Sequence, residues 1–133
     1  MAIDAALRRL VRQRARNRCE YCGIQQEELP FVTFHIEHVV SRQHGGGDDA
    51  DNLCEACHWC NFAKGTNLAT IVDGLLVRLF HPRRDVWSEP FMRRGDLVIG
   101  LTPVGRGTVR LLDMNDDDRR QIRSSSSHDE QYD

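Results

Sequence analysis

Residues 35–65, HIEHVVSRQHGGGDDADNLCEACHWCNFAKG, decide how this chain folds. The stretch opens with an alternating, β-branched run in which two histidines flank a glutamate, and it closes with a pair of cysteines two residues apart. The glycines and aspartates of residues 41–52 are typical of a loop. We therefore expect a strand over 31–40, then this loop, a short strand or turn into the cysteines, and helix at least from Asn61 to Lys64.

The flanking segments predict further elements. Apolar side chains at helical spacing, with arginines on the other faces, predict an amphipathic helix over residues 3–16. Alternating residues around Arg94-Gly95-Asp96 predict a β-hairpin, and Pro103 can open a helix after it. The fold class is thus α+β. The expected divisions are a main domain over 1–78, a hairpin and helix extension over 79–122, and a disordered acidic tail over 123–133.

The net charge of −2 hides an uneven distribution. Residues 1–18 hold six arginines and one acidic residue, whereas residues 113–133 hold seven acidic residues and three arginines. A basic body with an acidic tail is compatible with a nucleic-acid partner, although Arg-rich helix faces are commonly just solvated. We find no signal peptide, no run long enough to span a membrane and no dinucleotide fingerprint in Gly45–Gly47. We therefore expect a cytoplasmic protein with no membrane contact and no small-molecule cofactor.

Four of the five cysteines form two C-x2-C pairs, which are Cys19 with Cys22 and Cys57 with Cys60. Two such pairs can supply four thiolates to a tetrahedral Zn²⁺ ion, and reduced cytoplasmic cysteines favour a metal over a disulfide. Cys54 and Cys57 also form a C-x2-C pair, so Cys54 could replace Cys60. We prefer Cys60, because Cys54 alternates with Leu53 in a strand-like position. His58 is a weaker competing ligand.

The order acid-His, glycine-rich loop, Asn-Leu, Cys-x2-Cys-Asn and Lys-Gly resembles the HNH endonuclease family, in its four-cysteine zinc-containing branch of ββα-metal nucleases. The resemblance covers roughly residues 12–68. It implies a small zinc-stapled ββα-metal domain with an N-terminal helix and a short C-terminal β/α extension. It also implies metal-dependent hydrolysis of DNA, with RNA as an open alternative. Glu37 replaces the family's more usual aspartate, and Cys54 stands where an apolar residue is common.

The resemblance also implies residue roles. His38 would be the general base, since an imidazole with a pKa of about 6.5 can accept a proton from water. Glu37 and Asn61 would hold one catalytic Mg²⁺ or Mn²⁺ ion. His35, on the same strand face as Glu37, is a further ligand or a supporting partner, or else a packed histidine. Asn52 would bond across the loop and fix His38. The competing role for Asn61 is helix capping.

Three basic residues are candidate nucleic-acid contacts. Lys64 is the only lysine among eighteen Lys and Arg residues, which favours a specific phosphate contact as much as a helix-surface position. Arg42 and His44 lie in the loop and are weaker candidates. We expect Trp59 and Phe62 to pack over the zinc site rather than to stack on bases. The predicted function is a one-metal, histidine-base endonuclease; the alternatives are a zinc-stabilised nucleic-acid-binding module without catalysis and a cysteine redox sensor.

Overall fold

The structure is a computed structural model that describes residues 3–125. Over these residues four α-helices and three two-stranded antiparallel sheets follow one another, which confirms the α+β class. In chain order the elements are α1 (Ala5–Ala15), β1 (His35–His38), β2 (Leu53–Ala56), α2 (His58–Lys64), β3 (Ala69–Val72), β4 (Leu75–Arg78), β5 (Phe91–Arg94), β6 (Leu97–Gly100), α3 (Pro103–Leu111) and α4 (Asp117–Ser125). None of these helices is long and apolar enough to cross a membrane.

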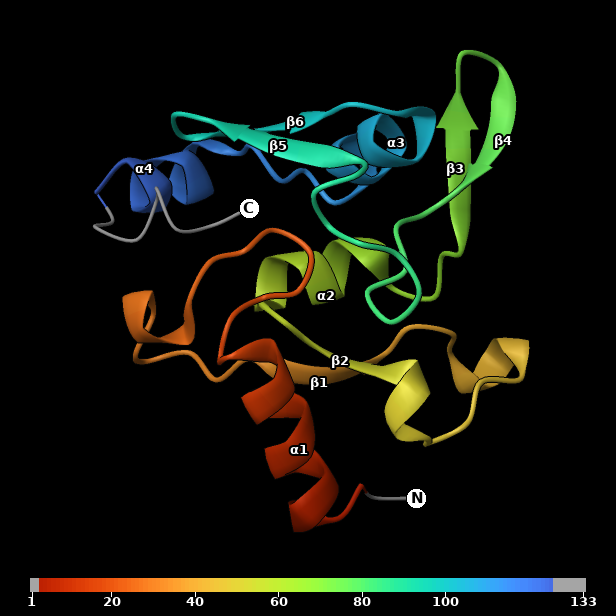
Figure 1. Ribbon diagram of the computed structural model, residues 1–133, viewed down its shortest axis with the longest axis vertical. Coiled ribbons are helices and arrows are strands. Elements are labelled where there is room, and N and C mark those ends of the chain that lie inside the picture. Colours follow the sequence, from red (N-terminus) through yellow and green to blue (C-terminus); the bar gives the residue numbers. More distant parts are fainter. Residues whose placement is uncertain (1–2, 126–133) are drawn as a thin grey trace.

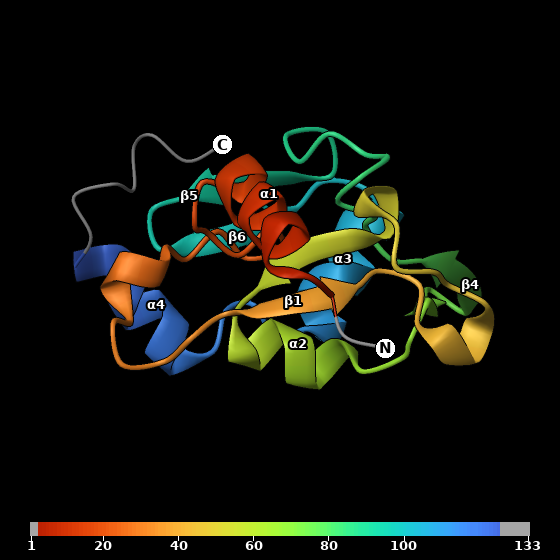
Figure 2. The same ribbon diagram turned by 90° about the horizontal axis from the view of Figure 1, so that it is seen from below.

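The ββα unit consists of β1, β2 and α2. β1 pairs with β2 in a register that sets Glu37 opposite Cys54 and His38 opposite Leu53. The pair lies between α1 on one face and α2 on the other (Figure 1, Figure 2). β1 is shorter than the strand expected over 31–40. Its ladder begins only at His35, because the backbone groups of Phe34 bond to the side chains of Gln26 and Arg12 instead.

Both helices of this unit have identifiable ends. Asp4 caps α1 by accepting from the backbone N–H of Leu7, and Arg16 ends it in a left-handed conformation with φ 57°, so the helix expected over 3–16 is confirmed. α2 begins at His58, where the thiol of Cys57 accepts from the backbone N–H of Cys60. The helix expected at least from Asn61 to Lys64 is confirmed, whereas the competing capping role of Asn61 is wrong, since Asn61 lies one turn inside α2.

The C-terminal extension is partly as expected. The hairpin of β5 and β6 turns at Gly95 and Asp96, and α3 begins at Pro103 after the cap Thr102, so both predicted elements are confirmed. The hairpin of β3 and β4 was not expected. Asp73 and Gly74 form its turn with φ 50° and 81°. An Asp-Gly pair between apolar residues is a strong signal for such a hairpin.

One hydrophobic core joins the ββα unit to the extension. Its buried residues include Phe80, Phe91 and Val98 from the extension and Phe34 and Val39 from the ββα unit. The core thus spans the boundary expected between residues 78 and 79. Helix α4, in which Arg119 and Arg123 are buried, continues to Ser125 and so extends into the tail expected from residue 123. The three divisions remain a prediction, and residues 126–133 of the expected tail lie outside the described residues.

Candidate metal centre and candidate active site

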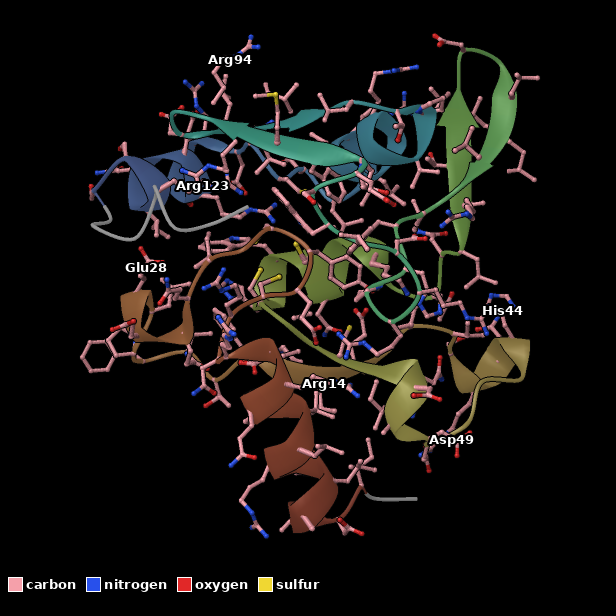
Figure 3. The ribbon with its side chains drawn as sticks, in the orientation of Figure 1. Arg14, Glu28, His44, Asp49, Arg94 and Arg123 are labelled. Carbon is pink, nitrogen blue, oxygen red and sulfur yellow. The ribbon has the colours of Figure 1, made fainter. Side chains whose placement is uncertain are left out.

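The four paired cysteines converge on one point. The sulfur atoms of Cys19, Cys22, Cys57 and Cys60 all lie within 4.8 Å of one another, and all four residues are buried. Figure 3 shows the sulfur atoms gathered at the start of α2. Each pair forms the same turn, in which the second residue's backbone N–H donates to the first residue's sulfur at 3.4 Å. Within residues 3–125 no other group of three or more Cys, His, Asp or Glu side chains is placed to hold a metal ion.

The donor set of this cluster fits structural zinc. Four thiolates in two C-x2-C turns are the usual tetrahedral ligands of Zn²⁺. Burial raises the pKa of the Cys19 and Cys60 thiols, so a divalent cation is the charge that would hold them as thiolates. Arg119 adds a buried positive charge, and its Nη1 donates to Cys60 Sγ at 3.1 Å. The cluster therefore supports a structural zinc site.

The competing zinc ligands are placed elsewhere. The Cys54 thiol lies 3.8 Å from both the Tyr21 hydroxyl and a carboxylate oxygen of Glu37, outside the cluster. His58 is partly exposed and stacks on Trp59, with ring centroids 4.3 Å apart. The geometry thus favours Cys60 over Cys54 as a ligand. Trp59 packs against the core as expected, whereas the expectation for Phe62 is wrong, since its side chain is 90% exposed.

Glu37 is buried on the α2 side of β1. Its Oε2 accepts a hydrogen bond from the Tyr21 hydroxyl at 2.7 Å and lies 3.8 Å from Lys64 Nζ. Burial raises the pKa of Glu37 to about 7, although Lys64 and Tyr21 act in the opposite direction. Its Oε1 is buried and has no hydrogen-bond partner among the described residues. One carboxylate oxygen is thus fixed, and the other can accept a proton, a hydrogen bond or a cation.

Lys64 supports Glu37 from α2. Its side chain is 2% exposed, and Nζ donates to the carbonyl of Val39 at 2.8 Å. The side chain therefore points toward β1 instead of the surface. Asn61 lies three residues earlier on α2 and is partly exposed, so it occupies a neighbouring position on the same side of the helix. The structure thus supports neither helix capping by Asn61 nor a helix-surface position for Lys64.

His38 faces the opposite side of β1, as strand alternation requires. Its Nε2 lies 2.7 Å from Asp48 Oδ1, and Arg42 binds both oxygens of Asp48 at 2.9 and 3.0 Å. These hydrogen bonds, His38 first, lower the pKa of Asp48 below its usual value. An ionised carboxylate only accepts hydrogen bonds, so Nε2 carries the proton and Nδ1 of the neutral ring is the basic nitrogen.

Asp48 is the residue that sequence reasoning missed. It lies in the Gly-rich loop, ten positions after His38, and two adjacent aspartates follow the glycines without any pattern to separate them. Only the closed loop brings one of them to the imidazole. Arg42, considered as a phosphate contact, is part of the same cluster.

Asn52 closes this loop onto β1. Its amide oxygen accepts from the backbone N–H of Val40 at 2.9 Å, and its amide nitrogen donates to the carbonyls of Val40 and Gly47 at 2.8 Å. Gly46 permits the close approach, because a Cβ there would lie 1.7 Å from the carbonyl oxygen of Val40. The loop that carries Asp48 is thereby held against the end of β1.

A shallow groove runs past His38. It is lined by Ile3, Arg8, Ile36, His38, Ser41, Arg42, Gln43 and Thr66. The groove draws on α1, β1, the loop and the segment after α2. His35 is exposed at the start of β1. His44 is exposed on the loop, and Figure 3 shows it on the same side of the molecule as Asp49. Neither histidine shares a described metal cluster with Glu37.

Comparison with known proteins gives a family match in this part of the chain. Residues 19–67 match the family model described as HNH endonuclease. Comparisons with curated proteins and with solved structures gave no match. The matched range holds both cysteine pairs, β1, β2, α2 and the loop with Asp48. Residues 19–67 are therefore similar to an HNH endonuclease domain, and the four-cysteine cluster fits the zinc-binding variant of that family.

Proposed function

We propose that this protein is a metal-dependent endonuclease that hydrolyses phosphodiester bonds of DNA, with His38 as the general base. The observation that supports this best is the hydrogen bond between His38 and Asp48 beside a groove that also contains Arg8 and Arg42. The bond orients an imidazole within an HNH domain, and arginines suit a phosphate backbone.

In this proposal His38 Nδ1 accepts a proton from the attacking water. Asp48 holds the ring through Nε2 and stabilises the imidazolium that results, since the carboxylate remains ionised. Arg42 keeps Asp48 in place and contributes positive charge near the phosphate. Hydrolysis would leave 5′-phosphate and 3′-hydroxyl ends, as the family implies.

Glu37 and Asn61 are the residues proposed to hold a catalytic Mg²⁺ or Mn²⁺ ion. Glu37 fits this role because Oε1 is a buried oxygen without a partner among the described residues, while Tyr21 and Lys64 hold Oε2. Oxygen donors suit these cations. A cation bound there would stabilise the negative charge that develops on the phosphate. His35, two positions before Glu37, is proposed as a supporting residue.

The test is nicking of supercoiled plasmid DNA with Mg²⁺ or Mn²⁺. We expect H38A to lose about 100-fold or more of the rate, because a general base contributes this much, and to keep its zinc content and circular dichroism spectrum. H58A, which changes a partly exposed histidine outside the groove, is the matched control and should keep the wild-type rate. Full activity of H38A would end the proposal. Labelled RNA in the same assay decides between the two nucleic acids.

A second candidate function is a zinc-stabilised nucleic-acid-binding module without catalysis. The specific observation in its favour is that Glu37 is only 7% exposed and already has Lys64 as a positive neighbour. This candidate predicts a gel shift that survives removal of Mg²⁺ and Mn²⁺, with no nicking under either ion. The endonuclease predicts nicking that requires one of them.

A further inference from the structure

A second basic site lies at the C-terminal end of α1. The helix ends at Arg16, where two successive left-handed residues, Arg16 and Asn17, turn the chain back. This turn brings three arginines to the wall of one pocket of about 360 Å³. The pocket is lined by Arg14, Ala15, Arg16, Arg18, Cys19, Glu20, Phe80, Pro82, Asp85 and Trp87.

Positive charge dominates this pocket. Its two carboxylates are each bound to an arginine outside the lining: Asp85 to Arg78 at 2.7 and 3.2 Å, and Glu20 to Arg83. Arg83 adds a further guanidinium, whose Nε is buried without a hydrogen-bond partner in the described part of the chain. Burial, and then the nearby charge of Arg14, lower the pKa of Arg83 to about 10. Like charges are thus held together, as in a site built for an anion.

The pocket is physically joined to the candidate active site. Arg14 Nη2 donates to the carbonyl of Leu53 at 2.7 Å, and Leu53 is paired with His38 across the sheet. Figure 3 shows Arg14 on α1 beneath the β1–β2 pair. At the other end of α1, Arg8 lines the groove beside His38. One short helix therefore connects the groove of the general base with the arginine pocket.

We propose that this pocket binds a backbone phosphate of the nucleic-acid substrate, at a position away from the phosphate that is cleaved. The guanidinium fork of arginine matches phosphate oxygens, and the apolar surface of the partly exposed Pro82 and Trp87 suits the adjoining sugar. The identity of the ligand rests on the proposed function, whereas the preference of the pocket for an anion rests on its own charges.

The test measures binding without cleavage, in an H38A background. R16N removes one exposed pocket arginine and keeps a residue type that tolerates the left-handed conformation of position 16. We expect R16N to weaken binding of a DNA duplex about threefold to tenfold. We also expect the plot of log K against log salt to become less steep by about 0.9, the value for one lost phosphate contact. Fluorescence anisotropy titrations at salt concentrations from about 50 to about 200 mM give both the affinity and the salt slope.

Two variants complete the design. R16K keeps the charge and should restore most of the salt slope. R94N removes an exposed arginine on the β5–β6 hairpin, far from Arg14 in Figure 3, and should behave as the parent protein. An R16N protein with the parent affinity and slope would overturn the proposal. The proposal would also be overturned if inorganic phosphate bound the parent protein tightly and R16N left DNA binding unchanged. The pocket would then be a site for free phosphate.

The outcome is separate from that of the proposed function. If wild-type protein never nicks DNA but R16N lowers the salt slope, the endonuclease proposal fails and the phosphate site stands. If wild-type protein nicks DNA and R16N changes neither affinity nor slope, only the phosphate site fails.

Discussion

At the scale of single residues, the position of Asp48 is the feature most directly tied to chemistry. A histidine can act as a general base, the role proposed for His38, only when its tautomer and ring orientation are fixed. Asp48 does both through a 2.7 Å hydrogen bond to Nε2, and Arg42 in turn fixes Asp48 through both carboxylate oxygens. The three side chains come from β1 and from the loop after it, so the loop is part of the site.

We expect D48N to reduce the rate of plasmid nicking by about 10-fold to 100-fold, the usual effect of losing a partner that orients a functional histidine. The amide can donate to the ring as well as accept from it, so the tautomer is no longer fixed. D49N changes the adjacent exposed aspartate and is the matched control. Equal rates for D48N and D49N would show that the bond to His38 has no role in cleavage.

His81 predicts a pH dependence of stability. Burial, followed by the charge of Arg84, lowers the pKa of His81 below 6.5, and Asp85 offsets this only in part. The folded state thus holds this proton less tightly than the unfolded chain does. The contribution of His81 to the unfolding free energy is complete above pH 6.5 and is lost as the pH falls through the lower, folded-state pKa.

Urea unfolding at pH 8 and at pH 5.5 tests this. We expect the wild-type midpoint to fall more between these two values than the midpoint of H81Q, which has no proton to bind. H44Q, at an exposed loop histidine, should follow the wild type. A fall in H81Q that matches the wild type would show that His81 is not the group responsible.

At the scale of elements, local sequence signals predict those elements whose causes are local. The cap Asp4, the Pro103 helix start and the Gly95-Asp96 turn all act within a few residues, and the elements they predict are present. The turn at Asp73-Gly74 is equally local and was readable, although it was missed. The start of α2 differs, because Cys57 caps that helix only when its thiol is turned into the cysteine cluster.

The packing of α3 against the β5–β6 hairpin depends on glycines. A Cβ at Gly105 would lie 2.0 Å from the carbonyl oxygen of Pro90 and 3.2 Å from the Cα of Gly100, both backbone atoms. We expect G105A to lower the unfolding free energy by about 1–3 kcal/mol or more through this overpacking, even though alanine favours helices.

Gly47 provides the control for this prediction. A Cβ there meets only the side chain of Asp49 at 3.7 Å, an ordinary contact, so G47A should change stability by no more than about 0.5 kcal/mol. Denaturant midpoints of the zinc-loaded proteins give both values. A G105A protein as stable as G47A would mean that α3 can move away from Pro90 at little cost.

At the scale of the whole molecule, the cysteine cluster joins the two ends of the described chain. α4 reaches it through Arg119, which donates to Cys60 Sγ, and through Arg123, which lies 3.4 Å from the carbonyl oxygen of Cys22. The sequence alone predicts the four ligands from their spacing. It does not predict the arginines, because no spacing rule links Arg119 with Cys60 or Arg123 with Cys22, which are 59 and 101 positions apart. No spacing rule links Arg14 with Arg83 either, or Asp48 with His38, although this last pair is only ten positions apart.

This connection leads to a prediction about zinc retention. Arg119 is 1% exposed, and its charge offsets the negative charge that four thiolates accumulate around one divalent ion. We expect R119M to lose zinc to a competing chelator about 10-fold to 100-fold more readily than the wild type, as measured with a chromogenic chelator.

R120M changes the next residue, whose half-exposed side chain lies 3.3 Å from Asp96, and should retain zinc normally. Because Arg119 also binds the carbonyl of Leu112 at 2.7 Å, zinc loss in R119M should be accompanied by faster amide exchange in α4. Wild-type zinc retention in R119M would show that α4 packs beside the cluster without stabilising it.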